Sequence, residues 1–438
     1  MKTWRLRQGA DRRIRSGHPW IFSNELTESP KGHEPGAPVR LEDVKGQFLA
    51  LGYGNPHSLI SFRALSYDAS VEDATKTDFL VQKLLRAWKN RASLGYQFSF
   101  RLAYGEGDFF PGLVVDRYLI ETAGGKQAQV FAVQVLTAGM QYALKDVAAY
   151  FQLVTSEARA AGLTDLDWNS TAVVLRNDVN VRKLEGLQYE EAKALKSIEG
   201  VELSTSDIVL HSPWNWTEKI LMRVDLVEGQ KTGFFLDQAY NIQVLCEMIK
   251  ARAEYFRGLQ RPVKILDLCC YVGQWSTKMS QVLKQLGIPV EVTLVDVSEP
   301  ALKMAAFNVE RIGVNKVETM KMDVLEDLPK LPDRTFDIVI ADPPAFVKAK
   351  KDLPTGSHAY LKLNTHAVRL TKSGGLVASC SCSGLFKEED LVFVLQKAVR
   401  RDGREARCIA HGGHAPDHPV LVSFPEGFYL KMFVHSVD

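Results

Sequence analysis

Residues 263–273 contain the sequence VKILDLCCYVG, in which an apolar run ends at Asp267 and a short turn ends at Gly273. The segment WSTKMSQVLKQLG that follows has the apolar spacing of an amphipathic helix. Further strand-like runs, VEVTLVDV, FDIVIADPP and GGLVASCS, alternate with helical patterns along the rest of the chain. This alternation predicts an α/β domain in which helices cover both faces of a mainly parallel sheet.

Carboxylates stand at the ends of four successive strand-like runs: Asp267, Asp296, Asp323 and Asp342. Ligands of open α/β sheets bind at the carboxyl ends of the strands, so we expect these side chains at one site. The turn has one glycine rather than the three of a dinucleotide fingerprint, which makes a pyrophosphate a poor fit. A nucleoside fits better, with Asp296 accepting from ribose hydroxyls and Asp323 from an adenine amine. The alternative is that each aspartate only caps the helix after its strand.

Length and composition are those of a globular protein with two or three domains. The chain has 438 residues, of which 46% are hydrophobic and 24% charged. A formal net charge of +2 means that any nucleic-acid surface must be a local patch. No apolar run reaches the roughly 18 residues that span a bilayer, and no secretory signal is expected at the N-terminus. Six cysteines in so long a chain do not resemble a disulfide framework, so a cytoplasmic location is expected.

The texture of the sequence predicts three domains. Residues 1–70 are rich in glycine, proline and short β-like runs, which indicates a small β-rich module. Residues 71–204 combine helical and strand-like patterns, which indicates a small α+β central domain. Its expected parts are a helix within 73–94, strands at 113–122, 129–136 and 171–177, a helix near 140–151 and a polar connection at 183–200. Residues 205–438 hold the α/β domain.

Further segments complete an ordered set: GHPWIF at 17–22, GEGDFFPGLVVDRY at 105–118, KTGFFLDQ at 231–238, DLCCYVG at 267–273, DPP at 342–344, SCSG at 381–384, DHPV at 417–420 and PEGFYLK at 425–431. Together they resemble the class I SAM-dependent methyltransferases, and within them the RlmI-like 23S rRNA cytosine-5 methyltransferases, over nearly the whole chain. The resemblance implies an N-terminal PUA domain, a central domain and a C-terminal Rossmann-like methyltransferase domain. It also implies S-adenosyl-L-methionine (SAM) as cofactor and 23S rRNA, or a large-subunit precursor, as partner. The oligomeric state stays open, and a homodimer is compatible with the sequence.

The expected cofactor site has three parts. The first turn contributes Asp267, Leu268, Cys269, Tyr271 and Gly273. The later strand ends contribute Asp296, Val297, Asp323, Val324 and Asp342. The resemblance implies that the KTGFFLDQ segment lies beside the cofactor, which adds Phe235, Asp237 and Gln238.

Cys382 is the expected nucleophile. Carbon 5 of cytosine becomes nucleophilic only after a thiolate adds to carbon 6, and this chemistry needs a cysteine at a strand end and an acid near N3. Cys382 in SCSG supplies the thiol and Asp342 the acid, whereas Ala345 stands where a second cysteine could follow the DPP. Cys380 is the rival thiol, since it is two positions away and would point to the same face of a strand. A buried, inert cysteine is the other interpretation of Cys382.

The first 16 residues carry six cations against one acid, Asp11. A solvated charged face is one interpretation. The neighbouring Trp4, Trp20 and Phe22 and the PUA resemblance favour RNA contact instead. The expected RNA-binding residues are Arg5, Arg7, Arg12, Arg13 and Arg15.

Three alternatives complete the analysis. Cys408, His411, His414 and His418 do not have the spacing of a standard zinc site, and they precede an expected strand PVLVSF, so no metal is expected. An aromatic residue close after the DPP, here Phe346, would suit methylation of an exocyclic base amine, which needs no cysteine. A non-catalytic RNA-binding or ribosome-assembly protein with a vestigial cofactor fold is the third, and the intact aspartate series argues against it.

Overall fold

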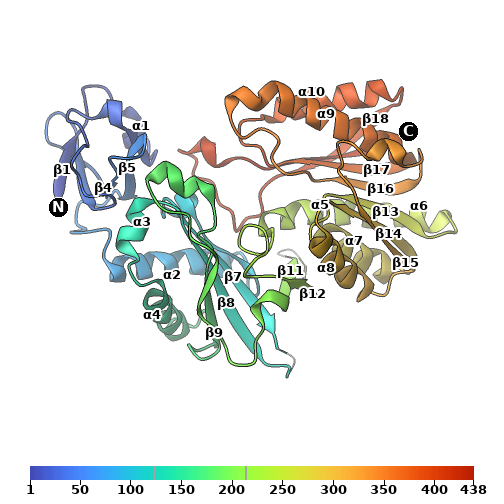
Figure 1. Ribbon diagram of the computed structural model, residues 1–438, viewed down its shortest axis with the longest axis horizontal. Helices are drawn as coiled ribbons and strands as arrows, with labels where there is room; N and C mark the ends of the chain where they lie inside the picture. The colour runs from blue at the N-terminus through green and yellow to red at the C-terminus, as the bar shows by residue number, and fades with distance from the viewer. Residues whose placement is uncertain (123, 213–214) are drawn as a thin grey trace. The chain divides into compact units, whose positions relative to one another are not determined.

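The computed structural model describes residues 1–122, 124–212 and 215–438 (Figure 1). The chain forms two compact units. The first unit consists of Met1–Lys219, Val224–Leu236 and Pro416–Gly427, and the second of Ile220–Arg223, Asp237–Ala415 and Phe428–Asp438. Among the described residues, no helix is long and apolar enough to cross a membrane.

The N-terminal part of the first unit is a five-stranded sheet in the order β1-β3-β4-β5-β2. Its strands are β1 (Lys2–Arg5), β2 (Trp20–Phe22), β3 (Pro38–Glu42), β4 (Phe48–Gly54) and β5 (Ile60–Ser66), and its one short α-helix is α1 (Arg12–Arg15). Trp4, Ile21, Leu41 and Phe62 are buried in its core. The β-rich module expected at the N-terminus is therefore present.

A second sheet forms the rest of the first unit, in the order β10-β9-β8-β7-β11-β12, with β6 paired to β7. The strands are β6 (Phe100–Tyr104), β7 (Leu113–Glu121), β8 (Gln127–Val135), β9 (Thr171–Leu175), β10 (Lys193–Lys196), β11 (Ser206–Ser212) and β12 (Asn215–Val224). Helices α2 (Thr77–Ser93) and α4 (Val147–Ala160) pack on it through a shared apolar core that includes Trp88, Phe131 and Phe151.

Several expectations for this region need correction. The helix expected near 140–151 is two helices, α3 (Ala138–Ala143) and α4, because the Asp146 side chain accepts from the Ala149 amide and starts a new helix. The polar connection at 183–200 contains the edge strand β10. β11 pairs with β7, so the central sheet continues past residue 205, where the sequence placed the start of the α/β domain. Residues 419–424 form no strand, and Pro416–Gly427 belongs to the first unit.

The second unit contains a seven-stranded sheet in the order β15-β14-β13-β16-β17-β19-β18. β13 (Val263–Leu268), β14 (Val290–Asp296), β15 (Lys316–Lys321), β16 (Phe336–Ala341) and β17 (Thr371–Ser381) run parallel, and β19 (Lys431–Val437) is antiparallel to β17 and to β18 (Ala406–Gly412). The parallel sheet expected from the alternating pattern is confirmed. Its order places the ends of β13, β14 and β16 side by side.

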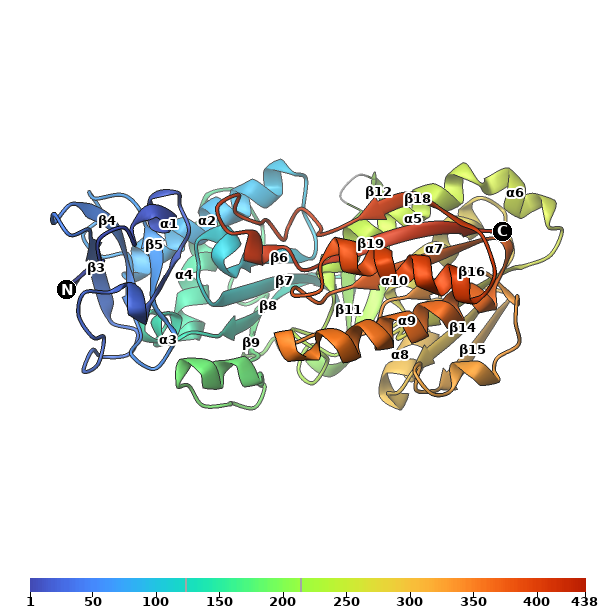
Figure 2. The ribbon, with the colours of Figure 1, turned by 90° about the horizontal axis from the view of Figure 1, so that it is seen from above.

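Helices cover both faces of this sheet. α5 (Ala239–Ala251), α7 (Gln274–Gln285) and α8 (Glu299–Glu310) share an apolar core with Ile265 and Ile338 on one face. α9 (Leu353–Leu370) and α10 (Glu388–Arg401) lie on the other face, where α9 packs on Leu266 and Val339. Figure 2 shows α9 and α10 lying across the strands, and Figure 1 shows the two helical layers on opposite sides of them.

Candidate active site

The turn after β13 is shaped by residues with left-handed backbone. Cys269, Tyr271 and Gly273 have φ values of 61°, 49° and 77°. A Cβ atom on Gly273 would lie 3.1 Å from Cα and Cβ of Ala305, so this position suits glycine on two grounds. α7 begins directly afterwards at Gln274, so its first amides lie beside the turn. Leu268 is buried in the core, whereas Cys269 is partly exposed.

Asp267 is fully buried and faces the start of α7. Its Oδ2 accepts from the Ser276 amide at 3.2 Å and the Ser276 hydroxyl at 2.6 Å, which is the helix-capping role that the sequence left open. Its Oδ1 is buried without a hydrogen-bond partner among the described residues. Burial raises the pKa of Asp267 to about 7, against the Ser276 hydrogen bonds and with help from the charges of Asp342 and Asp296.

Asp296 joins the end of β14 to the same turn. Its two oxygens accept from the amides of Tyr271 and Ser298, each at 2.9 Å. Val297, next in the chain, is 62% exposed. Asp323 is also exposed and accepts from the Leu325 amide at 2.8 Å, while Val324 is buried.

Asp342, which directly follows β16, is held by three N–H contacts. Gln238 Nε2 lies 2.9 Å from each of its oxygens, and Trp275 Nε1 lies 3.0 Å from Oδ2. The Gln238 carbonyl in turn accepts from Asn241 at 2.6 Å. Sequence reasoning missed Trp275 and Asn241, because a tryptophan or asparagine inside an amphipathic helix carries no signal of its own.

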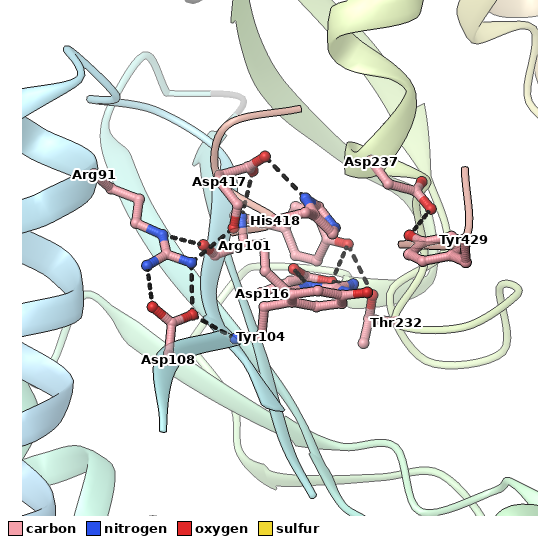
Figure 3. Close-up of polar contacts among 11 residues, drawn as sticks. Arg91, Arg101, Tyr104, Asp108, Asp116, Thr232, Asp237, Asp417, His418 and Tyr429 are labelled. Atoms are coloured by element: carbon pink, nitrogen blue, oxygen red, sulfur yellow. Dashed lines mark hydrogen bonds and ion pairs between the residues drawn. The ribbon is translucent and has the colours of Figure 1, made fainter. Parts of the chain in front are cut away.

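The KTGFFLDQ segment is divided between the two units. Asp237 and Gln238 belong to the second unit, and Asp237 Oδ2 accepts from the Tyr429 hydroxyl at 2.5 Å (Figure 3). Phe235 belongs to the first unit, where Lys231 lies over its ring. The structure therefore brings Gln238 to Asp342, and the expected place of Phe235 beside the cofactor stays a prediction.

Cys382 and Cys380 lie in different surroundings. Cys382 comes directly after the last residue of β17, is partly exposed, and has its Sγ 3.9 Å from the Pro343 carbonyl of the DPP segment. Cys380 lies within β17 and is fully buried in the core beneath α5, α7 and α8. Burial, with the charge of Asp342, raises the pKa of the Cys380 thiol well above its usual range.

The serines on either side of Cys382 are tied to Tyr360 of α9. The Ser381 hydroxyl donates to the Tyr360 oxygen at 2.9 Å, and the Ser383 and Tyr360 hydroxyls are also 2.9 Å apart. The Ser383 hydroxyl accepts from the Val347 amide at 3.1 Å, which joins this group to the loop after the DPP. The Tyr360 ring packs edge-on to Phe346 from that loop and stacks on Phe386 from the loop after Cys382.

Lys431 holds the loop after Cys382 from the side of β19. Its ammonium donates to the carbonyls of Ser383 at 2.7 Å, Phe386 at 2.6 Å and Tyr429 at 3.0 Å. Burial lowers the pKa of Lys431 to about 8, and the neighbouring Cys382 thiol opposes that shift. Sequence reasoning assigned no role to Tyr360 or Lys431. The PEGFYLK motif was the available signal for Lys431.

Most of the five N-terminal arginines already contact other groups. Arg7 Nε donates to the Leu26 carbonyl at 2.8 Å, and Arg12 is exposed with no ion pair in the described part of the chain. The remaining three lie against acids: Arg5 is 3.5 Å from Glu42, Arg13 is 3.3 Å from Glu25, and Arg15 is 2.5 Å from Asp11 and 2.6 Å from Asp43. The basic segment is therefore less of a positive patch than its composition indicates.

Three of the sequence motifs meet in a buried polar cluster of the first unit (Figure 3). Asp116 accepts from Arg101 through Nε at 2.6 Å and Nη2 at 2.8 Å, and also from the Thr232 hydroxyl. The Asp417 carboxylate accepts from the Arg101 amide at 2.8 Å and lies 2.9 Å from Nδ1 of His418. GEGDFFPGLVVDRY, KTGFFLDQ and DHPV thus anchor the fold of this unit.

The residues considered for zinc are spread over the chain. Cys408 and His411 lie on β18. His414 Nε2 accepts from the amides of Tyr429 at 3.1 Å and Leu430 at 2.9 Å. His418 belongs to the other unit, beside Asp417.

Comparison with known proteins supplies the family. Residues 5–67 match the model of a PUA-like domain, and residues 259–415 match that of a methyltransferase domain. "Ribosomal RNA large subunit methyltransferase I" of Photobacterium profundum is 32% identical over 98% of this chain and 97% of its own length. The protein of the same name from Erwinia tasmaniensis is 31% identical over 99% of this chain and 98% of its own. The chain belongs to the ribosomal RNA large subunit methyltransferase I family. The family expected from the sequence motifs is confirmed.

Solved structures agree on the fold. A chain described as a SAM-dependent methyltransferase from Streptococcus mutans superposes with a TM-score of 0.69 over 99% of this chain and all of that one, at 18% identity. A methyltransferase complexed with S-adenosylhomocysteine gives a TM-score of 0.70 over the same shares. The PUA-like domain, the Rossmann-like domain and the dependence on SAM, all expected from the sequence, are confirmed.

The strand-end residues fit this cofactor. The buried Oδ1 of Asp267 has room in its hydrogen bonding for an ammonium group, and a carboxylate at Asp296 suits ribose hydroxyls. The turn ending at Gly273 would hold the amino-acid part next to the first amides of α7. When bound there, SAM supplies an electrophilic methyl group.

Asp267 gives a pH-dependent prediction. Its pKa in the cofactor-free protein is about 7, and a cationic ligand beside Oδ1 favours the carboxylate, so binding should release a proton near that pH. We expect SAM affinity to rise between pH ~6 and ~8 as the folded carboxyl ionises without ligand. Calorimetry in buffers of different ionisation enthalpy measures the released protons. The isosteric Asp267→Asn variant should show only the titration of the cofactor's own amine, and equal proton release in both proteins would remove Asp267 from the site.

Proposed function

We propose that the protein methylates carbon 5 of a cytosine in large-subunit rRNA, through a covalent adduct at Cys382. The names of the relatives give the class of substrate, large-subunit rRNA. The observation that carries the choice of atom and mechanism is the position of Cys382. Its partly exposed thiol lies at the end of β17, 3.9 Å from the carbonyl of the residue after Asp342.

The proposed chemistry begins with the Cys382 thiolate. Its sulfur forms a bond to carbon 6 of cytosine, the ring loses its conjugation, and the displaced electron pair makes carbon 5 nucleophilic while N3 gains a proton. Carbon 5 then takes the methyl group. A base removes the proton from carbon 5, the double bond between carbons 5 and 6 forms again, and the sulfur leaves as thiolate.

Asp342 is assigned to the N3 side of the base. Gln238 and Trp275 fix its carboxyl group through three N–H contacts, so its orientation does not depend on the substrate. A carboxyl group held in this way can give a proton to N3 when the thiolate adds and take it back when the thiolate leaves. Tyr360 and Lys431 are positioning residues in this account, because they fix the loops that carry Cys382 and Asp342.

The nearby aromatic residue does not support methylation of an exocyclic amine. The Phe346 ring packs edge-on to Tyr360, with ring centroids 4.8 Å apart, and so serves the packing of α9. Mass spectrometry of nucleosides tests the choice directly. Unmodified large-subunit rRNA incubated with enzyme and SAM should yield 5-methylcytidine, whose position bisulfite sequencing then maps. An N-methylated nucleoside instead, or no methylated nucleoside at all, would overturn the proposal.

We assign RNA recognition outside the active site to the PUA-like domain, through Arg5, Arg7, Arg12, Arg13 and Arg15. Arg12 is exposed without an ion pair in the described residues, whereas Arg15 lies between two acids. Arg12→Ala should therefore lower the salt dependence of rRNA binding by about 0.7 log unit for one lost single-strand contact, and Arg15→Ala by less. Titrations at several salt concentrations measure this slope. Slopes equal to that of the wild type in both variants would mean that these arginines face solvent in the complex.

The remaining assignments belong to the same proposal. We propose a three-domain organisation with a PUA-like domain at 1–70, a central domain from 71, and the methyltransferase domain after it. The central sheet includes β11 and β12, which moves the second boundary beyond 205. A cytoplasmic location agrees with six cysteines that form no disulfide in the described structure.

A further inference from the structure

We propose that Lys348, Lys350 and Lys351 bind backbone phosphates of the substrate RNA next to the reacting base. The inference rests on the proposed function for the identity of the polymer. It adds a contact surface in the methyltransferase domain that is separate from the N-terminal arginines. These lysines follow the DPP segment in the sequence VKAKKD at 347–352.

The loop that carries the lysines is well anchored. Val347 is 2% exposed and packs in the core of α9 and α10, and its amide donates to the Ser383 hydroxyl at 3.1 Å. The Ala349 amide donates to Asp352 at 2.8 Å. Gly356 of α9 allows the loop to pack closely, since a Cβ there would lie 2.4 Å from a Val347 methyl group. The lysines therefore project from a fixed backbone directly beside the residues around Cys382.

The three lysine charges are available for a ligand. All three side chains are exposed, and none forms an ion pair in the part of the chain that the structure describes. The single acid of the loop, Asp352, accepts from the Ala349 amide. The surroundings of the N-terminal arginines differ, since Arg5, Arg13 and Arg15 each lie against an acid.

Exposed apolar side chains flank the same loop system. Leu385, in the loop after Cys382, is 39% exposed, and Phe428 is 63% exposed. Both lie close in sequence to groups that bind Ser383: Lys431 Nζ links the Ser383 carbonyl to the Tyr429 carbonyl, next to Phe428. Ser383 is also the residue that binds the Val347 amide. The lysines, Leu385 and Phe428 are thus all within a few residues of contacts to Ser383.

This combination fits RNA better than an acidic protein. Lysine ammonium groups are point charges that bind phosphates without sequence preference, and an exposed aromatic ring gives a base a surface on which to stack. A base that reaches Cys382 must leave its own stack, so the flanking nucleotides need to be held close to the thiol. The lysine loop is in the right place to hold their phosphates.

The test compares two variants of equal charge. Lys348, Lys350 and Lys351 are replaced by alanine together. The control replaces Lys303, Lys316 and Lys330, which are exposed in the same domain but each lie within 3.2 Å of an acid. Binding of a single-stranded oligoribonucleotide is measured by fluorescence anisotropy over a range of salt concentrations. The lysine-loop variant should lose about 2 log units of salt slope, close to 0.7 for each contact, and the control variant much less.

Further arms decide between outcomes. Replacement of the three lysines by arginine should restore the slope, and SAM affinity should be equal in all variants. An unchanged slope in the alanine variant, or no salt-dependent binding by the wild type, would overturn the proposal. Equal competition by polyglutamate would also overturn it in favour of an acidic protein partner. Because the measurement is binding, it does not depend on which atom of the base is methylated.

Discussion

Replacement of Cys382 by alanine is expected to abolish methyl transfer while cofactor binding stays near the wild-type value. In the proposed mechanism carbon 5 becomes nucleophilic only after sulfur has added to carbon 6, so no partial route remains when the thiol is gone. Loss of a covalent nucleophile typically lowers turnover by several orders of magnitude, and we expect at least ~10³-fold here. Single-turnover transfer of radiolabelled methyl groups to rRNA measures the loss, and calorimetry with SAM confirms that the site is intact.

Cys380→Ala is the matched control for this prediction. Cys380 is fully buried in the core of the second unit, so its truncation should cost stability, at about 1 kcal/mol, and leave methyl transfer in place. If Cys380→Ala lost activity and Cys382→Ala kept it, the assignment of the nucleophile would be reversed. If the double variant stayed fully active, there would be no covalent step, and methylation of an amine would become the better account.

Asp116→Ala is expected to have the largest effect on stability. Asp116 is fully buried and accepts both nitrogens of the Arg101 guanidinium as well as the Thr232 hydroxyl. Removing the carboxylate leaves the Arg101 charge buried without its partner, and breaking such a pair typically costs about 3–5 kcal/mol. The change should also loosen Val224–Leu236, since Thr232 holds this segment to β7. Thermal unfolding followed by circular dichroism should show a clearly lower midpoint for the first unit.

Asp11→Ala provides the comparison for the buried pair. Asp11 also binds an arginine, Arg15, but that pair is exposed to solvent, where water and salt weaken ion pairs. The unfolding midpoint of this variant should stay close to that of the wild type. A similarly small shift for Asp116→Ala would show that the polar cluster of Figure 3 does not stabilise the first unit.

The sequence was most informative where a local pattern determines the structure. β13 spans Val263–Leu268, the same residues as the apolar run VKILDL, and the following helix begins within one residue of its expected start. The strand-end carboxylates were predictable because parallel strands bring their ends to one edge of the sheet. The difference between Cys380 and Cys382 was also predictable in outline, since one lies inside a strand and the other after its end.

What the sequence did not predict depends on contacts between distant segments. The pairing of β11 with β7 joins residues far apart in the chain, so the second domain boundary was placed too early. Tyr360 and Lys431 lie on α9 and β19, and their importance comes only from the side chains and carbonyls that they meet around Ser383. The KTGFFLDQ motif was expected at the cofactor as a whole, whereas Thr232 serves the polar cluster of the first unit and Gln238 contacts Asp342.

The most direct test of the central claim is the capture of the covalent adduct. In a substrate RNA that carries 5-fluorocytidine, the fluorine at carbon 5 cannot leave as a proton does, so elimination of the thiol is blocked after methyl transfer. The wild-type enzyme with SAM should form a complex with this RNA that survives denaturation, and mass spectrometry of its peptides should find the nucleotide on Cys382. The Cys382→Ala variant should form no such complex. Attachment to Cys380, or no denaturation-resistant complex with the wild-type enzyme, would contradict the account.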